Sequence, residues 1–136
     1  MTTSATETRC VVVEREVPHP PEKIWRALTQ PHLIAEWLMK NNFEAREGHR
    51  FSLTASWGKV DCEVQTIEPH RALTYAWNTK DLRSVVRWTL TPTETGTLLR
   101  MEQEGFQPGQ KPYFQGATAA WPRFIAALER VVDQLG

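Results

Sequence analysis

Histidines are the residues in this chain best suited to bind a metal or transfer a proton, and they are widely spaced. The four are His19, His32, His49 and His70, and they fall in predicted turns or at helix starts. No two have the i, i+4 spacing, or the clustering with cysteine, that is typical of a metal site. We therefore expect solvated surface histidines, no metal and no cofactor.

The sequence also gives little support for a nucleophilic catalytic residue. Cys10 and Cys62 each lie within a strand-like run, and neither has a histidine close by in the sequence. The Gly-x-Ser-x-Gly motif is absent, and the seven glycines are scattered singly, unlike a phosphate-binding loop. We expect two free, half-buried thiols, with a disulfide only if the two strands adjoin, and we predict no catalytic residue.

Carboxylates near aromatic residues are the remaining candidates for acid–base chemistry, since a buried Glu can act as a general acid or base. The strand glutamates fall on the polar face by alternation, so we favour solvated charges over catalytic groups. Arg87 is expected to pair across strands with Glu63 or Glu102, in a surface contact worth little. The glutamates considered are Glu36, Glu63, Glu68, Glu102 and Glu104.

Large aromatic and apolar side chains are the most unusual feature, and the chain has six tryptophans. Such residues usually pack a core, which is the favoured interpretation for any single one. Together they could instead line a cavity for an apolar ligand, with Tyr75, Trp77, Trp88 and Gln103 as its polar groups. The candidate ligand-binding residues are Trp37, Phe51, Leu53, Trp57, Val64, Tyr75, Trp77, Trp88, Met101, Gln103, Trp121 and Phe124.

Composition bounds the class of protein. Lys plus Arg is 16 and Asp plus Glu is 16, so there is no basic excess to bind nucleic acid. No run approaches the ~20 apolar residues that span a bilayer. Residues 1–8 are polar and lack the apolar core of a signal peptide. We expect a cytoplasmic protein, with no membrane insertion, in which a disordered tail (1–8) precedes one domain (9–136).

The elements that must position these residues follow from periodicity and turn signals. A β-branched run opens the chain, and two short helices begin at Pro21 and Pro31, because proline suits the first turn of a helix. The last segment, Lys111 to Leu135, has an apolar stripe of helical period, with a kink or restart at Pro122. The predicted strands cover 9–17, 43–45, 50–57, 59–68, 72–78, 84–90 and 97–104.

Alternation within these strands gives the predicted sheet an apolar face and a charged face. In 72–78, for example, Leu73, Tyr75 and Trp77 share one side. Short links between successive strands favour an antiparallel meander, and its apolar face must be covered. The sequence therefore predicts an α+β fold, in which a curved antiparallel sheet of six to seven strands wraps around the long C-terminal helix.

The order of these elements resembles the helix-grip fold of the START-like (SRPBCC) superfamily. Within it, the chain is most similar to the family of activator-of-heat-shock-protein-90-ATPase homologues. The similarity covers about residues 9–135 and is carried by the order of several short motifs. These are PPEKIWRALTQPHLIAEWL, FEAREGHRFSL, CEVQTIEPHRALTYAWN, ETGTLLRMEQEGF and AAWPRFIAALERVV.

The chain also departs from the family pattern. Glu47 and His49 stand where the family often has proline and a second glycine, and Gln103 stands where it often has histidine. The change at Gln103 weakens any claim of a catalytic or ligand-orienting histidine on that strand. Arg46 matches the family's turn arginine, which we interpret as holding the loop beside a pocket mouth, with a smaller chance of meeting an anionic ligand group.

The resemblance implies three functions of different classes. The first is binding of a small hydrophobic molecule, lipid-like, aromatic or polyketide-like, between the sheet and the last helix. The second is a chaperone-interacting module, although the chain matches only the C-terminal half of the two-domain eukaryotic activators. The third is a cyclase or hydratase, which lacks a convincing acid–base pair here. We expect the first, in a monomer or weak dimer that binds no nucleic acid, with a chaperone as the alternative partner.

Overall fold

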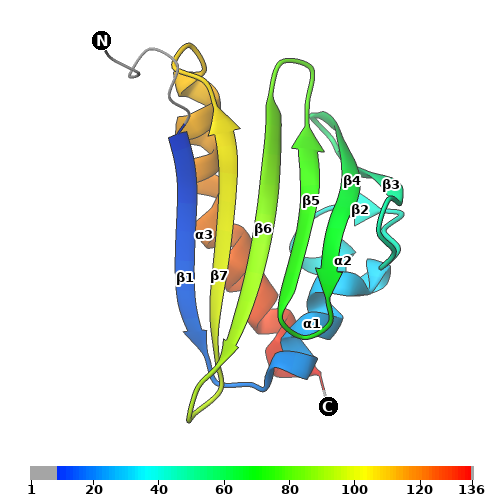
Figure 1. The fold of residues 1–136 in the computed structure, drawn as a ribbon, viewed down its shortest axis with the longest axis vertical. Coiled ribbons are helices and arrows are strands. Elements are labelled where there is room, and N and C mark those ends of the chain that lie inside the picture. Colours follow the sequence, from blue (N-terminus) through cyan, green and yellow to red (C-terminus); the bar gives the residue numbers. More distant parts are fainter. Residues whose placement is uncertain (1–8, 136) are drawn as a thin grey trace.

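The structure is a computed structural model that describes residues 9–135, so the predicted tail at 1–8 lies outside the described residues (Figure 1). One strand is followed by two short helices, then by six consecutive strands, and a long helix ends the chain. In order, the elements are β1 (Arg9–Val17), α1 (Pro21–Thr29), α2 (Pro31–Trp37), β2 (Lys40–Asn41), β3 (Arg50–Ala55), β4 (Gly58–Glu68), β5 (Ala72–Asn78), β6 (Arg83–Pro92), β7 (Thr97–Phe106) and α3 (Lys111–Gln134).

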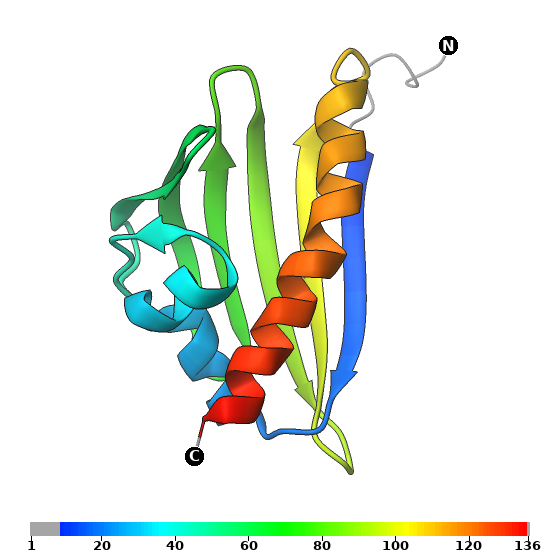
Figure 2. The ribbon, with the colours of Figure 1, turned by 180° about the vertical axis from the view of Figure 1, so that it is seen from behind.

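The strands form one antiparallel sheet of seven strands in the order β1-β7-β6-β5-β4-β3-β2. Helix α3 crosses one face of this curved sheet, and α1 and α2 cover the same face beside its C-terminal end (Figure 2). This arrangement confirms the predicted α+β helix-grip fold. The first strand pairs with the last long one, β7, because the meander returns to the edge where the chain began.

Strand register brings the predicted apolar residues together on the face that the helices cover. Trp88 on β6 lies between Leu73 of β5 and Met101 of β7, and all three are fully buried. Since side chains alternate along a strand, this register places every second residue of β4 to β7 inward. An irregularity in β4 between Val64 and Thr66 shifts the alternation, so that Ile67 pairs with Leu73 beyond it.

The two short helices are built as the prolines predict. Pro21 and Pro31 occupy their first turns, where the missing backbone N–H costs nothing. Trp37, at the end of α2, donates a hydrogen bond from its ring Nε1 to the carbonyl of Ala27 in α1, at 2.8 Å. That bond fixes the angle between the helices and directs the Trp37 ring onto the sheet, 5.5 Å from the Trp88 ring.

Of the two alternatives predicted at Pro122, a kink or a restart, the structure excludes the restart, because α3 is continuous through this residue, and its axis bends part-way along (Figure 2). The proline costs the helix one backbone hydrogen bond. The two parts of the helix pack differently. All of its buried residues, from Trp121 to Val132, lie in the second part, and 111–120 contains none. The first part therefore packs less closely on the sheet, which it contacts through the Phe114 ring, 5.6 Å from the Phe106 ring of β7.

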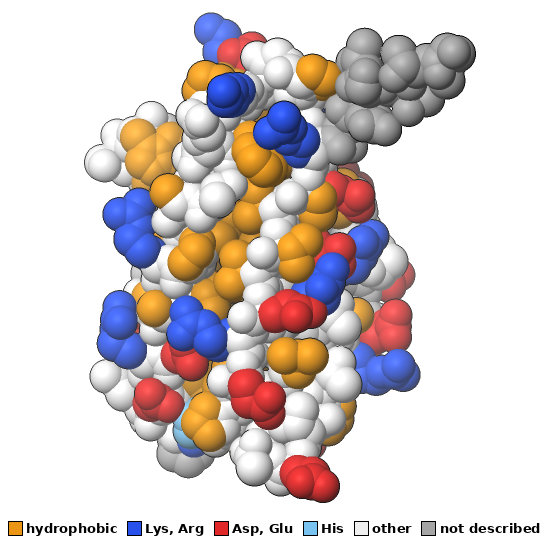
Figure 3. Space-filling model, turned by 90° about the vertical axis from the view of Figure 1, so that its left-hand side faces the viewer, with side chains coloured by type: hydrophobic (Ala, Val, Ile, Leu, Met, Phe, Trp, Pro, Cys, Tyr) orange, Lys and Arg blue, Asp and Glu red, His pale blue; other side chains and the backbone are white. Residues whose placement is uncertain are grey.

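On the side where β1 meets α3, hydrophobic side chains form a band between charged ones (Figure 3). Two contacts tie the strand to the helix there. Arg15 forms a 2.7 Å salt bridge with Glu129, and the Arg9 guanidinium lies 5.3 Å from the centre of the Phe114 ring. Cation–π and ion-pair contacts of this kind are individually weak at exposed sites; the first holds the second part of α3, and the other the first part, to the sheet edge.

Two predicted strands need correction. The chain at 43–45 is not a strand; the edge strand is Lys40–Asn41, after which side chains take over the backbone's hydrogen bonds. The Asn41 side chain accepts from the Phe43 amide at 3.1 Å, and the chain turns so that Phe43 enters the core. The strand predicted over 50–57 ends at Ala55, which leaves Trp57 in the turn before Gly58 and 64% exposed.

Both cysteines are free, as predicted, but neither is half-buried. Cys10 is exposed on β1 and Cys62 is buried on β4, with three strands between them. Burial raises the pKa of the Cys62 thiol, because the thiolate would lose its hydration. Burial also raises the pKa of the Cys10 thiol, and the nearby Glu102 and Glu104 add to this rise.

Histidines and strand charges lie largely where the sequence predicts. His32 and His70 are exposed, whereas His19 and His49 are half-buried; His19 Nε2 lies 2.6 Å from Asp133 Oδ1. Across the outer face, Arg87 pairs with Glu102 at 4.0 Å and with Glu104 at 3.6 Å. The other predicted partner, Glu63, pairs instead with Arg50. Residues 9–135 contain no cluster of His, Cys, Asp and Glu that could hold a metal.

Candidate ligand-binding pocket

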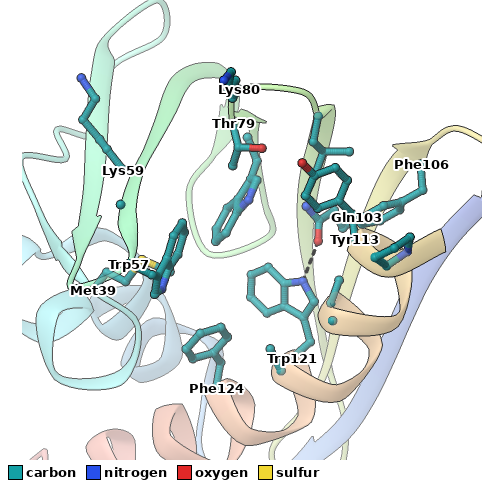
Figure 4. Close-up of a pocket in the computed structure, with 17 residues that line it drawn as sticks. Met39, Trp57, Lys59, Thr79, Lys80, Gln103, Phe106, Tyr113, Trp121 and Phe124 are labelled. Carbon is teal, nitrogen blue, oxygen red and sulfur yellow. Dashed lines mark hydrogen bonds between the residues drawn. The ribbon is translucent and has the colours of Figure 1, made fainter. Parts of the chain in front are cut away.

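A pocket of about 660 Å³ opens between the concave face of the sheet and the first part of α3 (Figure 4). Its size is within the ~300–1,000 Å³ range of small-molecule sites. The lining comes from the tips of two hairpins, from β5 and β7, and from α3. The lining residues are Met39, Trp57, Gly58, Lys59, Trp77, Thr79, Lys80, Leu82, Gln103, Phe106, Pro112, Tyr113, Gly116, Ala117, Ala120, Trp121 and Phe124.

Small helical residues are the reason that space remains here. Gly116, Ala117 and Ala120 line the pocket from α3, and a Cβ placed on Gly116 would meet no atom within 4 Å. One turn later the helix presents Trp121, and beyond it Ile125, both of which are buried. Between Gly116 and Trp121 the pocket-lining side chains of α3 thus change from small to large, at the point where the helix begins to bury residues against the sheet.

Tryptophan rings form the inner wall of the pocket. The Trp77 and Trp121 ring centres are 5.3 Å apart, and Trp121 also contacts Phe124 edge-on at 5.6 Å. Behind this wall, Trp121 packs edge-on against Trp88 at 5.8 Å. These tilted and edge-to-face contacts are the arrangement that aromatic rings prefer, so the wall is rigid and already shaped.

The polar group at the inner end of the pocket is Gln103, which is 2% exposed. Its Oε1 accepts a 2.7 Å hydrogen bond from Trp121 Nε1, and its Nε2 donates a 3.0 Å bond to Ser84 Oγ. The Ser84 hydroxyl in turn donates to the Trp77 carbonyl at 2.6 Å. Because both ends of the amide are engaged, Gln103 acts as a brace that holds Trp121 in place.

Tyr75 and Trp88 form a separate buried pair deeper in the core. Trp88 Nε1 donates a 3.0 Å hydrogen bond to Tyr75 Oη. Burial raises the pKa of Tyr75, an effect that the hydrogen bond from Trp88 partly opposes. Each ring thus satisfies the polar atom of the other, and neither residue lines the pocket.

The mouth of the pocket is aromatic on both sides and carries two lysines, Lys59 and Lys80 (Figure 4). Trp57, 64% exposed, stands on the β3–β4 turn, and Tyr113, 42% exposed, stands on the first turn of α3. Tyr113 Oη donates a 3.2 Å hydrogen bond to Asp81, which raises the pKa of the tyrosine. This contact ties the β5–β6 loop to the start of α3.

The predicted ligand-binding residues separate into two groups. One group lines the pocket: Trp57, Trp77, Gln103, Trp121 and Phe124. The other is packed in the core, where α2, the second part of α3 and neighbouring strands cover it; Phe51, for example, contacts Phe43 at 5.0 Å and Tyr75 at 5.4 Å. That group consists of Trp37, Phe51, Leu53, Val64, Tyr75, Trp88 and Met101.

Sequence reasoning missed the residues that come from turns and from the first part of α3. Strand alternation ranks only strand residues, so it could not select Thr79 or Lys80, and it placed Lys59 on the polar face of its strand. Spacing on the last helix did offer a signal, because Tyr113, Gly116 and Ala120 recur on one side of it, and the last two have small side chains. The turn residue Arg46 does not line the pocket. It bonds to Glu44 and His49, which agrees with a role in holding its loop.

Comparison with known proteins decides the family. Residues 18–133 match the family model described as activator of Hsp90 ATPase homolog 1-like protein. The chain belongs to this family. Membership in the activator of Hsp90 ATPase homolog 1-like family agrees with the helix-grip fold and with the predicted resemblance to the START-like superfamily. A search of curated protein sequences finds no significant match.

Solved structures of similar proteins share the whole fold. A protein of Mesorhizobium loti is 56% identical, with a TM-score of 0.92 over 94% of this chain and 99% of its own. A Bacillus halodurans protein is 25% identical, with a TM-score of 0.82 over 93% and 99%.

DynU16, a protein of the dynemicin biosynthetic locus, also has the fold. It is 26% identical, with a TM-score of 0.82 over 92% of this chain, which spans 47% of DynU16.

None of the helices within residues 9–135 is both long and apolar enough to cross a membrane.

Proposed function

We propose that this protein binds a small hydrophobic molecule, lipid-like or aromatic, in the pocket between the sheet and the first part of α3. The observation that carries the proposal is the open space beside Gly116 and Ala120, walled by Trp77, Trp121 and Phe124. The space is apolar inside and open at one end, which suits a ligand that enters from water.

An aromatic ligand would find partners already in position. The Trp77 and Trp121 rings are held by packing and by the Gln103 brace, so little side-chain freedom would be lost on binding. Within the described part of the chain, Trp77 Nε1 has no hydrogen-bond partner, and it is not a fully buried atom. It can therefore donate to an acceptor oxygen on the ligand.

Catalysis of the cyclase or hydratase type is a weaker proposal. The polar group at the inner end, Gln103, does not titrate, and both ends of its amide are engaged. The ionisable side chains of the lining are Lys59, Lys80 and Tyr113, and all belong to the mouth. A proton-transfer group must lie within hydrogen-bond reach of the reacting atom, so a ligand held against the tryptophans would not meet one.

Interaction with a chaperone is the alternative function, and the description of the family favours it. The exposed Trp57 and Tyr113 would be the first residues to place in such an interface, since exposed aromatics often anchor protein contacts. Stimulation of the ATPase of a purified Hsp90 by this protein, lost in a Trp57→Ala variant, would establish this function in place of ligand binding. We further propose a cytoplasmic location and a monomer or weak dimer.

The experiment that tests ligand binding is an amide NMR titration of the isotope-labelled protein with lipids, flavonoid-like aromatics and polyketide-like acids. We expect localised shifts at the pocket, in β5 near Trp77, in β7 near Gln103 and in α3 over 113–124. Shifts confined to the outer face of the sheet, or none with any compound, would contradict the proposal.

A further inference from the structure

We propose that the ligand carries a neutral acceptor oxygen, the carbonyl of a ketone or quinone on an apolar ring system, and that Trp77 Nε1 donates a hydrogen bond to it. The inference rests on the proposed ligand-binding function and adds the chemical class of the ligand. It follows from the hydrogen bonds of the buried indole groups and from the polar atoms of the inner wall.

Three buried indole groups in this core have protein acceptors. The Nε1 atoms of Trp37, Trp88 and Trp121 donate hydrogen bonds of 2.8, 3.0 and 2.7 Å, respectively. Trp77 differs from them, because it is only 8% exposed and its Nε1 has no partner among residues 9–135. This Nε1 still meets solvent, since the described residues contain no fully buried side-chain nitrogen or oxygen without a partner.

The pocket is where Trp77 Nε1 meets solvent. In the sheet, Trp77 is flanked by Cys62 of β4 and Ser84 of β6, and its ring contacts the Trp121 ring at 5.3 Å. The remaining side of the ring lines the pocket. A ligand that covers this side displaces the water there, and an apolar atom over Nε1 would leave a buried donor unpaired. An acceptor oxygen on the ligand avoids that cost.

The acceptors of the inner wall are already engaged. Because an indole N–H can only donate, the Gln103 atom that faces Trp121 Nε1 must be the amide oxygen. The Gln103 amide nitrogen then donates to Ser84 Oγ, and this hydroxyl donates to the Trp77 carbonyl. The inner wall therefore offers a ligand an unused donor, Trp77 Nε1, while its acceptors already receive hydrogen bonds. This arrangement favours a carbonyl over a hydroxyl at this point of the ligand.

The charge of the lining favours a neutral acceptor over a carboxylate. The ionisable residues Lys59, Lys80 and Tyr113 belong to the hairpin tips and to the mouth (Figure 4). A carboxylate against Trp77 would lose its hydration and gain one hydrogen bond from an uncharged donor. A carbonyl has less hydration to lose, so a single indole N–H is a sufficient partner for it.

The test compares two probes that share one bicyclic apolar body, α-tetralone and tetralin, by calorimetric titration. We expect wild-type protein to bind the ketone about fivefold more tightly than the hydrocarbon, because one hydrogen bond is gained. Trp77→Phe keeps an aromatic ring and removes the N–H. In this variant the preference should disappear or reverse, because the carbonyl would lose its water partners without meeting a donor.

A second readout uses the wild-type protein. In NMR spectra, the Trp77 indole N–H resonance should lie further downfield in the α-tetralone complex than in the tetralin complex, because a hydrogen bond deshields the proton. Trp25 on α1 is the matched control, since it is 9% exposed, lies outside the pocket lining and has no indole acceptor within residues 9–135. Trp25→Phe should keep the full preference for the ketone.

The outcomes separate this inference from the proposed function. Equal binding of both probes by wild-type protein, or a preference that survives Trp77→Phe, would overturn the inference while leaving ligand binding intact. The same holds for a Trp77 indole resonance that is identical in the two complexes. Failure of both probes to bind would overturn the proposed function, and this inference with it.

Discussion

The two parts of α3 cover the same sheet with opposite results. From Trp121 onward, large side chains meet Trp88 and its neighbours, and the space is closed. Before Trp121, Gly116 and Ala120 face Trp77 across an open pocket. The sheet contributes tryptophan in both places, so it is the size of the helical side chains that decides between core and cavity. Aromatic residues alone do not mark a binding site.

The largest effect is expected in the closed part. Trp88 is fully buried and contacts both Trp37 and Trp121. Trp88→Ala should lower the free energy of unfolding by about 3–5 kcal/mol, because it leaves a large cavity and strands the Tyr75 hydroxyl. Urea unfolding followed by circular dichroism measures this change. A loss below about 1 kcal/mol would mean that this part is not closed.

The corresponding change in the open part should act on binding more than on stability. Trp77 lines the pocket, so Trp77→Ala enlarges a space that already exists, and its stability cost should fall at or below ~3 kcal/mol. Affinity for an apolar probe should fall about tenfold or more, because the ligand loses a wall of aromatic contact. Thermal unfolding beside a probe titration compares the two losses. Equal sensitivity of stability and binding would count against the pocket role.

Gln103 lies between the open and the closed parts of the molecule. Replacing it tests whether its hydrogen bond holds the Trp121 ring in place. Gln103→Leu keeps a similar volume but leaves the buried Trp121 Nε1 without an acceptor. We expect a loss of about 1–3 kcal/mol in stability, the penalty for an unsatisfied buried group. The indole N–H resonance of Trp121 should also shift and broaden in NMR spectra. An unchanged Trp121 resonance would show that packing alone holds the ring.

The smallest predicted effect concerns alkaline pH in the closed part. Burial raises the pKa of Cys62 above its ordinary value of 9.0. A raised pKa means that the neutral thiol is favoured in the folded state, so its contribution is complete below pH 9 and is lost as the pH rises. The loss is about 1.4 kcal/mol per pH unit above that value.

Urea unfolding of wild type and Cys62→Ala on either side of that pKa checks this effect. The difference between the two proteins should change with pH by about that amount per unit. A pH-independent difference would show that the Cys62 thiol is as accessible to water in the folded protein as in the unfolded chain.

Much of the fold could be predicted because the physical signals were local. Alternation in β5 to β7 placed Leu73, Trp88 and Met101 inward, and the register confirms it. The short edge strand β2 could not be predicted, because the Asn41 side chain, rather than a neighbouring strand, accepts the hydrogen bond from the Phe43 backbone amide. The sequence also could not show which aromatic residues line the pocket and which pack in the core, because this depends on the space between α3 and the sheet. Trp57 lies at the mouth through turn geometry rather than strand alternation.

The most direct test of the comparison between the two parts of α3 is to fill the pocket beside the first part. Gly116→Leu points a large side chain into the space beside Trp77 and Trp121, while leucine favours the helix by roughly 0.8 kcal/mol over glycine. Ala119, exposed and outside the pocket lining, offers the matched control Ala119→Leu.

We predict that Gly116→Leu keeps or raises the melting temperature and abolishes binding of pyrenebutanol, measured by calorimetric titration, while Ala119→Leu binds like wild type. Undiminished binding by Gly116→Leu would contradict the account, because the ligand would then not occupy the space that the small residues of α3 leave open.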